Sequence, residues 1–196
     1  MIALLTSLSA AAAPRKEAIR GSRVEGTRRL VDGLLGLGRK PRALICASAI
    51  GYYGDRGDED LTESAGPGEG FLRDVAKGWE QEAARAAAGG IRVVSLRLGV
   101  VLAKEGGALP RMLLPFRMGL GGRLGGGRQW MSWIHIEDLV AVIRFALSRE
   151  DLSGPINVVA PEPVTNAAFT AALARVLRRP AILPVPAFAL RLAIGE

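Results

Sequence analysis

Two arginines and a serine stand where an anion or a small oxygenated molecule could be held. Arg128 follows the glycine-dense segment Gly119 to Gly127 and lies two residues before Trp130. Its planar guanidinium matches two oxygens of a phosphate or carboxylate, so Arg128 is our first candidate for an anion site. Arg97, near the end of an apolar run, is the second. Ser48 closes another such run, and parallel sheets place ligands at the ends of their strands. Its alternative is a hydrogen bond to local backbone.

Metal and disulfide chemistry have little to build on. The sole histidine is His135 and the sole cysteine is Cys46, so neither a disulfide nor a Cys- or His-rich metal site can form from this chain. We expect His135 to be a structural group with a minor role at a substrate site. One loop holds five acids whose spacing does not match a calcium loop, and we expect a solvated turn there. These are Asp55, Asp58, Glu59, Asp60 and Glu63.

Apolar periodicity predicts alternating helices and strands. Helical spacing covers Pro14 to Leu37, Phe71 to Ala88, Leu109 to Met118, Glu137 to Ser148 and Asn166 to Leu177. Continuous Val-, Ile- and Leu-rich runs predict strands at Ala43 to Ser48, buried on both faces, and at Ile91 to Val101. Shorter extended segments are predicted at Trp130 to Ile136 and Ile156 to Ala160. The strand, helix, strand order with a long crossover predicts a parallel sheet covered by helices.

The glycine pattern is incomplete for a dinucleotide site. Complete Rossmann domains open with a strand, a G-x-G-x-x-G-type turn and a helix that holds the pyrophosphate. No such turn follows a strand here. Gly119 to Gly127 has the wrong neighbours for that role, so we interpret it as a flexible loop able to fold over a ligand. We therefore expect an α/β fold, with a partial Rossmann-like parallel sheet flanked by helices and a small C-terminal substrate lobe.

Composition favours one intracellular domain without nucleic-acid or membrane partners. The chain has 196 residues, 49% of them hydrophobic, and its net charge of +7 comes from arginines scattered along the whole sequence. Scattered charge argues against a nucleic-acid stripe, and no apolar run reaches the length of a membrane helix. Met1 to Ala13 resembles the apolar part of a secretory signal but has no basic residue before it. We expect a soluble, cytoplasmic protein of unknown oligomeric state.

Four stretches together resemble the epimerase-family short-chain dehydrogenase/reductases, an atypical extended branch. They are Ser22 to Thr27 (SRVEGT), Ala47 to Gly54 (ASAIGYYG), Arg128 to Leu139 (RQWMSWIHIEDL) and Leu183 to Phe188 (LPVPAF). The resemblance implies an NADP-type cofactor, with NAD as the alternative, and a small-molecule or nucleotide-sugar-like substrate. It also implies that both ends of the family pattern are missing. Residues 1–14 are then a poorly defined lead-in, 15–180 the later part of the Rossmann-like domain, and 181–196 the start of a truncated extension.

The resemblance also suggests residue roles. Ser48 matches the serine or threonine that bonds the substrate oxygen. The usual proton-transferring Y-x-x-x-K is absent, because Arg73 stands four residues before Lys77. Tyr52 and Tyr53, the only tyrosines, are the possible substitutes, with a packed residue and a loop-side lid as the competing interpretation. Cofactor contacts are assigned to Ala47, Ser48, Arg97 and Gly99, and substrate contacts to Arg128, Trp130 and His135.

Three functional hypotheses follow. The first is an NAD(P)-dependent oxidoreductase or epimerase-like isomerase. The second is a non-catalytic nucleotide-binding or interaction module that keeps the Rossmann-like shell, suggested by the lost Y-x-x-x-K. The third treats the chain as a fragment without activity of its own, with an exposed sheet edge that makes it poorly soluble.

Overall fold

The computed structural model describes residues 13–181 and divides the chain into two compact units. Unit 1 comprises Met1–Arg15, Val100–His135 and Ala160–Glu196, and unit 2 comprises Lys16–Gly99 and Ile136–Val159. From Lys16 onward the chain runs through unit 2, unit 1, unit 2 and unit 1 again. The domain bounds expected from the sequence, 15–180 and 181–196, stay a prediction.

Unit 2 is built on a three-stranded sheet in the order β1-β2-β6, with all pairings parallel. The strands are β1 (Ala43–Ala49), β2 (Arg92–Leu98) and β6 (Gly154–Val158). The central strand β2 is the most buried, whereas β6 carries an exposed proline, Pro155, which suits an edge strand. The parallel pairing of β1 with β2 confirms the predicted arrangement on which the enzyme hypothesis depended.

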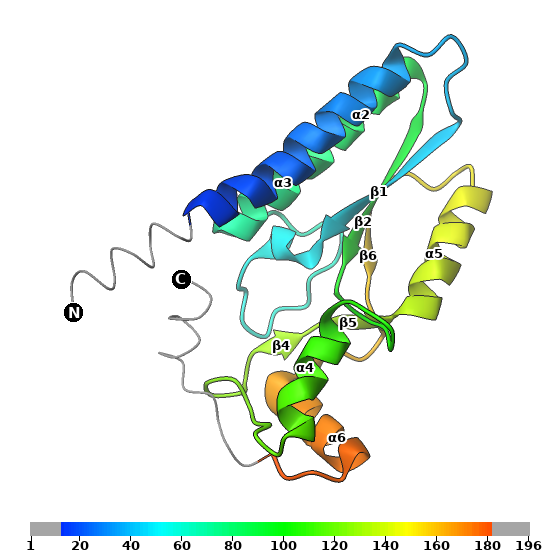
Figure 1. Cartoon of the computed structure of the whole chain (residues 1–196). Coiled ribbons are helices and arrows are strands. Elements are labelled where there is room, and N and C mark those ends of the chain that lie inside the picture. The colour runs from blue at the N-terminus through cyan, green and yellow to red at the C-terminus, as the bar shows by residue number, and fades with distance from the viewer. Residues whose placement is uncertain (1–12, 182–196) are drawn as a thin grey trace. The chain divides into compact units, whose positions relative to one another are not determined.

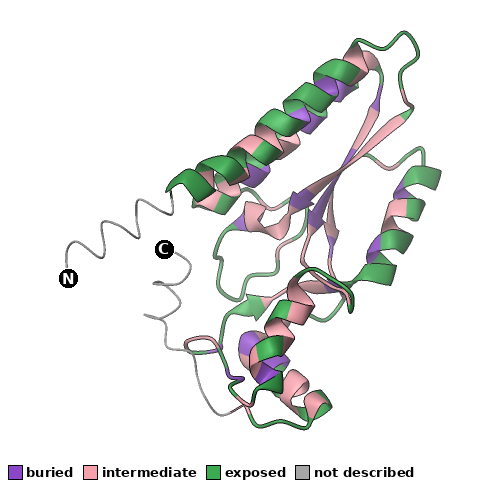
Figure 2. Ribbon diagram, viewed as in Figure 1, coloured by how far each residue is buried: buried purple, intermediate pink, exposed green. Residues whose placement is uncertain are grey.

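Helices cover both faces of this sheet, as expected (Figure 1). On one face lie α2 (Gly26–Leu35) and α3 (Phe71–Ala84), side by side, and on the other lies α5 (Ile136–Ser148). Figure 2 shows buried residues on the helix sides that face the sheet and exposed residues on the outer sides. A core cluster of Val31, Ala86 and Ile91 packs between α2, the turn after α3 and the start of β2. Burial of these apolar side chains holds the helices to the sheet.

The predicted helix from Pro14 to Leu37 is interrupted. Residues 13–20 are helical, Gly21–Glu25 form a π-helical turn (η1), and α2 then runs to Leu35. Ser22 donates its hydroxyl proton to the Ile19 carbonyl at 3.1 Å, a local bond that competes with regular helix geometry. Apolar spacing located the helix, but it carries no information on this widened turn.

Two strand predictions need correction. Ala43 to Ser48 was expected to be buried on both faces, yet only Ser48 is fully buried, because β1 pairs within the described residues with β2 alone. Ile91 to Val101 was expected to be one strand. It breaks at Gly99, whose N–H bonds the Val158 carbonyl at 3.2 Å, and the chain continues as β3 (Val100–Leu102) in a different sheet.

Unit 1 contains two small sheets and two helices. In one sheet β3 pairs in parallel with β5 (Trp133–His135), and in the other β4 (Trp130–Met131) pairs antiparallel with β7 (Val164–Thr165). The helices are α4 (Ala108–Arg117) and α6 (Asn166–Leu177), and they contact each other. Thr165 caps α6 by accepting a hydrogen bond from the Ala168 N–H. The α6 bounds match the prediction.

Within residues 13–181 no helix is long and apolar enough to cross a membrane. The signal-like Met1 to Ala13 segment, apart from its last residue, and the Leu183 to Phe188 stretch lie outside the described residues. The expectations attached to them stay predictions.

Candidate functional site

Three polar residues stand at one level across the carboxyl ends of the unit 2 strands. Ser48 on β1 is the register partner of Arg97 on β2, which in turn is the partner of Asn157 on β6. Register partners in a parallel sheet project to the same face. Ser48 and Arg97 are 2% and 3% exposed. Because ligands of open parallel sheets bind at the carboxyl ends of the strands, this row marks the candidate site of unit 2.

Glu80 on α3 ties two of these residues together. Arg97 donates from Nε to Glu80 Oε1 and from Nη2 to Oε2, both at 2.9 Å, which is a bidentate ion pair. Ser48 donates its hydroxyl proton to Glu80 Oε1 at 2.6 Å. Burial opposes the charge of Arg97, but its hydrogen bonds with Glu80 and Tyr53 outweigh burial and raise the pKa of the guanidinium. Arg97 is therefore a permanent cation whose charge is matched inside the protein.

Tyr53 joins the same network from the single-turn helix η2 (Ile50–Tyr53) that follows β1. Its hydroxyl donates to Asn157 Oδ1 at 2.7 Å and accepts from Arg97 Nη1 at 2.9 Å. The residue is 3% exposed. Tyr53 thus connects the end of β1 to β2 and β6 through one buried hydroxyl.

Tyr52, its neighbour, is arranged differently. Its ring centroid lies 3.6 Å from the central guanidinium carbon of Arg97, and the ring meets that of Tyr53 edge to face at 5.4 Å. Tyr52 is half-buried, and its hydroxyl makes no hydrogen bond to the residues that the structure describes. A cation stacked on the ring fixes the ring plane and leaves the hydroxyl free.

The acidic loop between η2 and α3 closes over this network. Glu63 accepts from the Asn157 backbone N–H at 2.8 Å, and its own carbonyl accepts from Arg97 at 3.3 Å. The Gly68 N–H bonds the Tyr52 carbonyl at 3.1 Å, and a Cβ at Gly68 would overlap the carbonyl of Tyr53. All five acids of the loop are exposed, as expected for a solvated turn, and Glu63 in addition contacts the network. No group of three potential metal ligands occurs among the described residues.

The other residues predicted to contact a cofactor have weaker support. Ala47 precedes Ser48 on β1, and Gly99 is the joint between β2 and β3. Four hydrogen bonds within the protein already occupy the guanidinium of Arg97, so the structure leaves it little capacity to grip a phosphate. Its role in cofactor binding stays a prediction without geometric support. Cys46 is half-buried, and burial raises the pKa of its thiol, which makes it a poor nucleophile.

Unit 1 holds the predicted substrate contacts Arg128, Trp130 and His135 on or beside β4 and β5, and all three are exposed. The glycine-dense loop before them is anchored. The Leu124 N–H bonds Asn166 Oδ1 at 2.8 Å, and the Ala167 N–H bonds the Gly127 carbonyl at 2.9 Å. These bonds tie two points of the loop to the start of α6, and the expectation that the loop folds over a ligand stays a prediction.

The units differ in charge. Unit 2 has sixteen basic and sixteen acidic residues, whereas unit 1 has ten basic and three acidic residues and so carries the whole net charge of +7. Arg111, Arg117, Arg123 and Arg128 form no ion pair with the described residues. Although arginines are scattered through both units, acids balance the basic residues in number in unit 2 alone.

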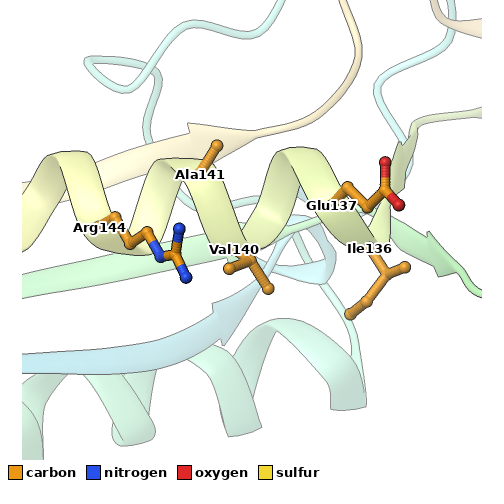
Figure 3. A pocket seen from close by; sticks show the side chains of 5 residues that line it. All are labelled: Ile136, Glu137, Val140, Ala141 and Arg144. Carbon is orange, nitrogen blue, oxygen red and sulfur yellow. The ribbon is translucent and has the colours of Figure 1, made fainter.

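A shallow hollow of about 490 Å³ lies on α5 (Figure 3). Ile136, Val140 and Arg144 follow one another at helical spacing along it, beside Glu137 and Ala141. Val140 is 42% exposed. The hollow is open and lacks a buried polar group aimed into it, so it is a weaker candidate than the Arg97 network.

Sequence reasoning missed Glu80 and Asn157. Glu80 sits in an amphipathic helix rich in other charges, and nothing in its spacing sets it apart. Asn157 lies in a short strand between apolar residues. The only available signal was a polar residue within an apolar strand, which a buried network requires.

The sequence matches one protein family over most of its length. The sequence profile of the NAD dependent epimerase/dehydratase family matches residues 2–160. The epimerase family protein YfhF of Bacillus subtilis is 46% identical over 182 residues, covering 92% of this chain and 60% of that protein. The epimerase family protein Mb2239 of Mycobacterium bovis is 45% identical over 181 residues, with the same coverage. The chain thus spans about three fifths of the length of these curated relatives.

Solved structures agree with this match. The human epimerase family protein SDR39U1, crystallised with NADPH, is 33% identical and superposes with a TM-score of 0.84 over 93% of this chain and 62% of its own. A dTDP-glucose 4,6-dehydratase from Streptomyces venezuelae has a TM-score of 0.74 at 19% identity, over 90% of this chain and 56% of its own. The second likeness concerns the Rossmann-like fold alone.

Proposed function

The chain belongs to the NAD dependent epimerase/dehydratase family, and we propose that it forms the reactive end of an NADP-dependent oxidoreductase or epimerase-like isomerase. The observation that carries this proposal is the row of Ser48, Arg97 and Asn157 at the carboxyl ends of three parallel strands, with two tyrosines beside it. Activity of the whole protein, its cytoplasmic location and the nature of the substrate are part of the proposal.

The residues present fit one end of a nicotinamide dinucleotide. Hydroxyl groups gather at the carboxyl edge of the unit 2 sheet, where doubly wound folds receive such ligands. Among residues 13–181 no strand leads through a G-x-G-x-x-G turn into a helix, so a pyrophosphate has no comparable cradle there. When bound, the cofactor supplies the hydride. Ala47 and Gly99 place backbone near the ends of β1 and β2, where a nicotinamide ring could pack.

The residues of unit 2 would orient the substrate and move a proton. Ser48, Tyr52 and Tyr53 carry the three hydroxyls near the row, and one of them must replace the missing Y-x-x-x-K as proton carrier. Glu80 and Arg97 neutralise each other, so the surrounding charge stays balanced whether the substrate is bound or absent. This neutral, buried ion pair keeps the hydroxyls in place, and its charges do not attract an anionic ligand away from them.

Unit 1 would bind an anionic group. Arg128 is exposed, has no ion-pair partner among the described residues and lies in a unit with net charge +7. Trp130 on β4 and His135 on β5 add an indole ring and an imidazole to this unit. A nucleotide-sugar-like or carboxylated molecule has the chemistry that such a surface recognises.

NADPH titration tests the cofactor, with Trp79, Trp130 and Trp133 as fluorescent reporters. The proposal expects a saturable change, together with oxidation of NADPH by at least one member of a panel of ketones and nucleotide sugars. The absence of a saturable change would reject it. Glu82→Gln is a control variant that should leave the NADPH titration unchanged, because Glu82 lies on the same helix as Glu80 but, among the described residues, forms ion pairs with Arg28 and Arg85 outside the network.

A binding module without turnover is the second candidate. It is favoured by one observation, since the hydroxyls of Ser48 and Tyr53 are both spent on bonds inside the protein. NADPH binding without any hydride transfer across the panel would support this candidate over the enzyme.

A further inference from the structure

We propose that Tyr52 is the residue that exchanges a proton with the substrate, and that Arg97 positions its ring. The inference rests on the proposed function, because it chooses among the three hydroxyls that the function could use. The choice follows from how each hydroxyl is bonded and how far each residue is buried.

Ser48 is excluded as the proton donor because its hydroxyl has a single proton, which already bonds Glu80. The side chain is 2% exposed, and its Oγ donates to Glu80 Oε1 at 2.6 Å, the short distance of a charge-assisted bond. A hydroxyl has one proton and two lone pairs. Ser48 can therefore accept a hydrogen bond from a ligand but has no proton left to give.

Tyr53 is excluded as the proton carrier because its hydroxyl already donates one hydrogen bond and accepts another. Its hydroxyl donates to Asn157 and accepts from Arg97, and the residue is 3% exposed. Proton transfer from Tyr53 to a substrate would first require breaking the bond to Asn157 and leaving its amide oxygen buried without that donor. Tyr53 is therefore a structural member of the buried hydrogen-bond network.

Tyr52 has what the other two lack. It is half-buried, and its hydroxyl is not bonded to any described residue. Its ring lies on the guanidinium of Arg97 at 3.6 Å, and its carbonyl accepts from the Gly68 N–H. Glu80 holds the guanidinium plane through two bonds, so the ring plane of Tyr52 is held in turn. The Arg97–Glu80 pair thus fixes the ring of Tyr52 and leaves the Tyr52 hydroxyl available to a ligand.

The proton and hydride transfers account for every bond that breaks or forms. For a carbonyl substrate, the bond from Oη of Tyr52 to its proton breaks and a new O–H bond forms on the carbonyl oxygen. Bound reduced nicotinamide would supply the hydride to the carbonyl carbon, and the C=O group would become a CH–OH group. The tyrosinate then takes a proton from water. In the oxidative direction the same atoms move in reverse.

Acetylation by N-acetylimidazole, located by peptide mass spectrometry, tests the assignment without any turnover assay. The chain has only two tyrosines, so the two products are easily told apart. We expect Tyr52 to be acetylated at least tenfold faster than Tyr53, and saturating NADPH to slow the reaction at Tyr52 severalfold. Faster acetylation of Tyr53, or NADPH binding that leaves Tyr52 unprotected, would overturn the inference while the proposed function stands. Absence of NADPH binding in the same samples would overturn both.

Variants separate the two tyrosines and the positioning residue. Tyr52→Phe should leave the melting temperature unchanged and abolish hydride transfer, whereas Tyr53→Phe should lower the melting temperature and reduce transfer less. Arg97→Lys keeps the charge but lacks the planar surface, so the protection of Tyr52 by NADPH should fall more than the NADPH affinity does. Equal losses of protection and affinity in Arg97→Lys would contradict the positioning role, and full transfer by Tyr52→Phe would contradict the catalytic role.

Discussion

The two units handle charge in opposite ways. In unit 2 acids and bases are equal in number, and several of them form ion pairs, from the exposed Arg149–Asp151 pair to the buried Arg97–Glu80 pair. In unit 1 the arginines outnumber the acids, and several have no acidic partner among the described residues. Paired charge fixes side chains in place, whereas unpaired charge is available to a ligand. We therefore propose side-chain positioning and proton transfer for unit 2 and anion recognition for unit 1.

Breaking the buried pair should have the largest effect. Arg97→Met leaves Glu80 without its ion-pair partner and removes one of the two hydrogen bonds of the Tyr53 hydroxyl, and we expect a loss of about 3–5 kcal/mol in the free energy of unfolding. Urea denaturation measures it. The double variant Arg97→Met with Glu80→Met removes both charges and should recover a substantial part of the loss. A double variant as unstable as the single one would show that packing around Arg97, not its pairing, matters.

The loop over the network is the next test. Gly68→Ala places a methyl group against the carbonyl of Tyr53, and we expect a cost of about 1–3 kcal/mol. Gly66→Ala is the matched control, because a Cβ there meets nothing within 4 Å. Equal stabilities of the two variants in thermal melts would mean that the loop does not close on Tyr53.

Unit 1 should respond in binding and not in stability. Arg128→Ala should weaken the binding of pyrophosphate about tenfold, the value of one charge-assisted contact, and leave the melting temperature unchanged. Calorimetric titration at two salt concentrations measures the affinity. The unit 2 variant Arg149→Ala should change neither the pyrophosphate affinity nor the melting temperature. Unchanged pyrophosphate affinity in Arg128→Ala would remove the anion role from this arginine.

The smallest effect concerns pH. Hydrogen bonds from Arg28 and then Arg85 lower the pKa of Glu82 below its ordinary value. A lowered pKa in the folded state gives stability that is present above the unfolded value and is lost as the pH falls through the folded value. Glu82→Gln should therefore be slightly less stable than the parent at pH 7 and equal to it at strongly acidic pH. A difference that persists in acid would point to packing.

Much of unit 2 could be predicted from its sequence. Apolar runs and helical spacing located β1, α3 and α5 to within a few residues, because burial on a sheet imposes those patterns. The break at Gly99 was missed, since valines and leucines continue on both sides of it and only long-range pairing separates β2 from β3.

The site was predicted unevenly for a physical reason. Ser48, Tyr52 and Tyr53 are close in sequence, so one motif located all three. Glu80 and Asn157 come from elements far along the chain, and only the fold brings them together. For the same reason Arg97 was assigned to a ligand, because its internal partner Glu80 could not be recognised from spacing.

Hydrogen–deuterium exchange with and without NADPH tests the central claim most directly. If the carboxyl edge of the β1-β2-β6 sheet receives the nicotinamide end, NADPH should slow exchange in peptides that cover Ser48 to Gly54 and the end of β2. The segment around Arg149 and Asp151 serves as the internal reference. Saturating NADPH that leaves the Ser48 to Gly54 peptide unchanged would contradict the claim.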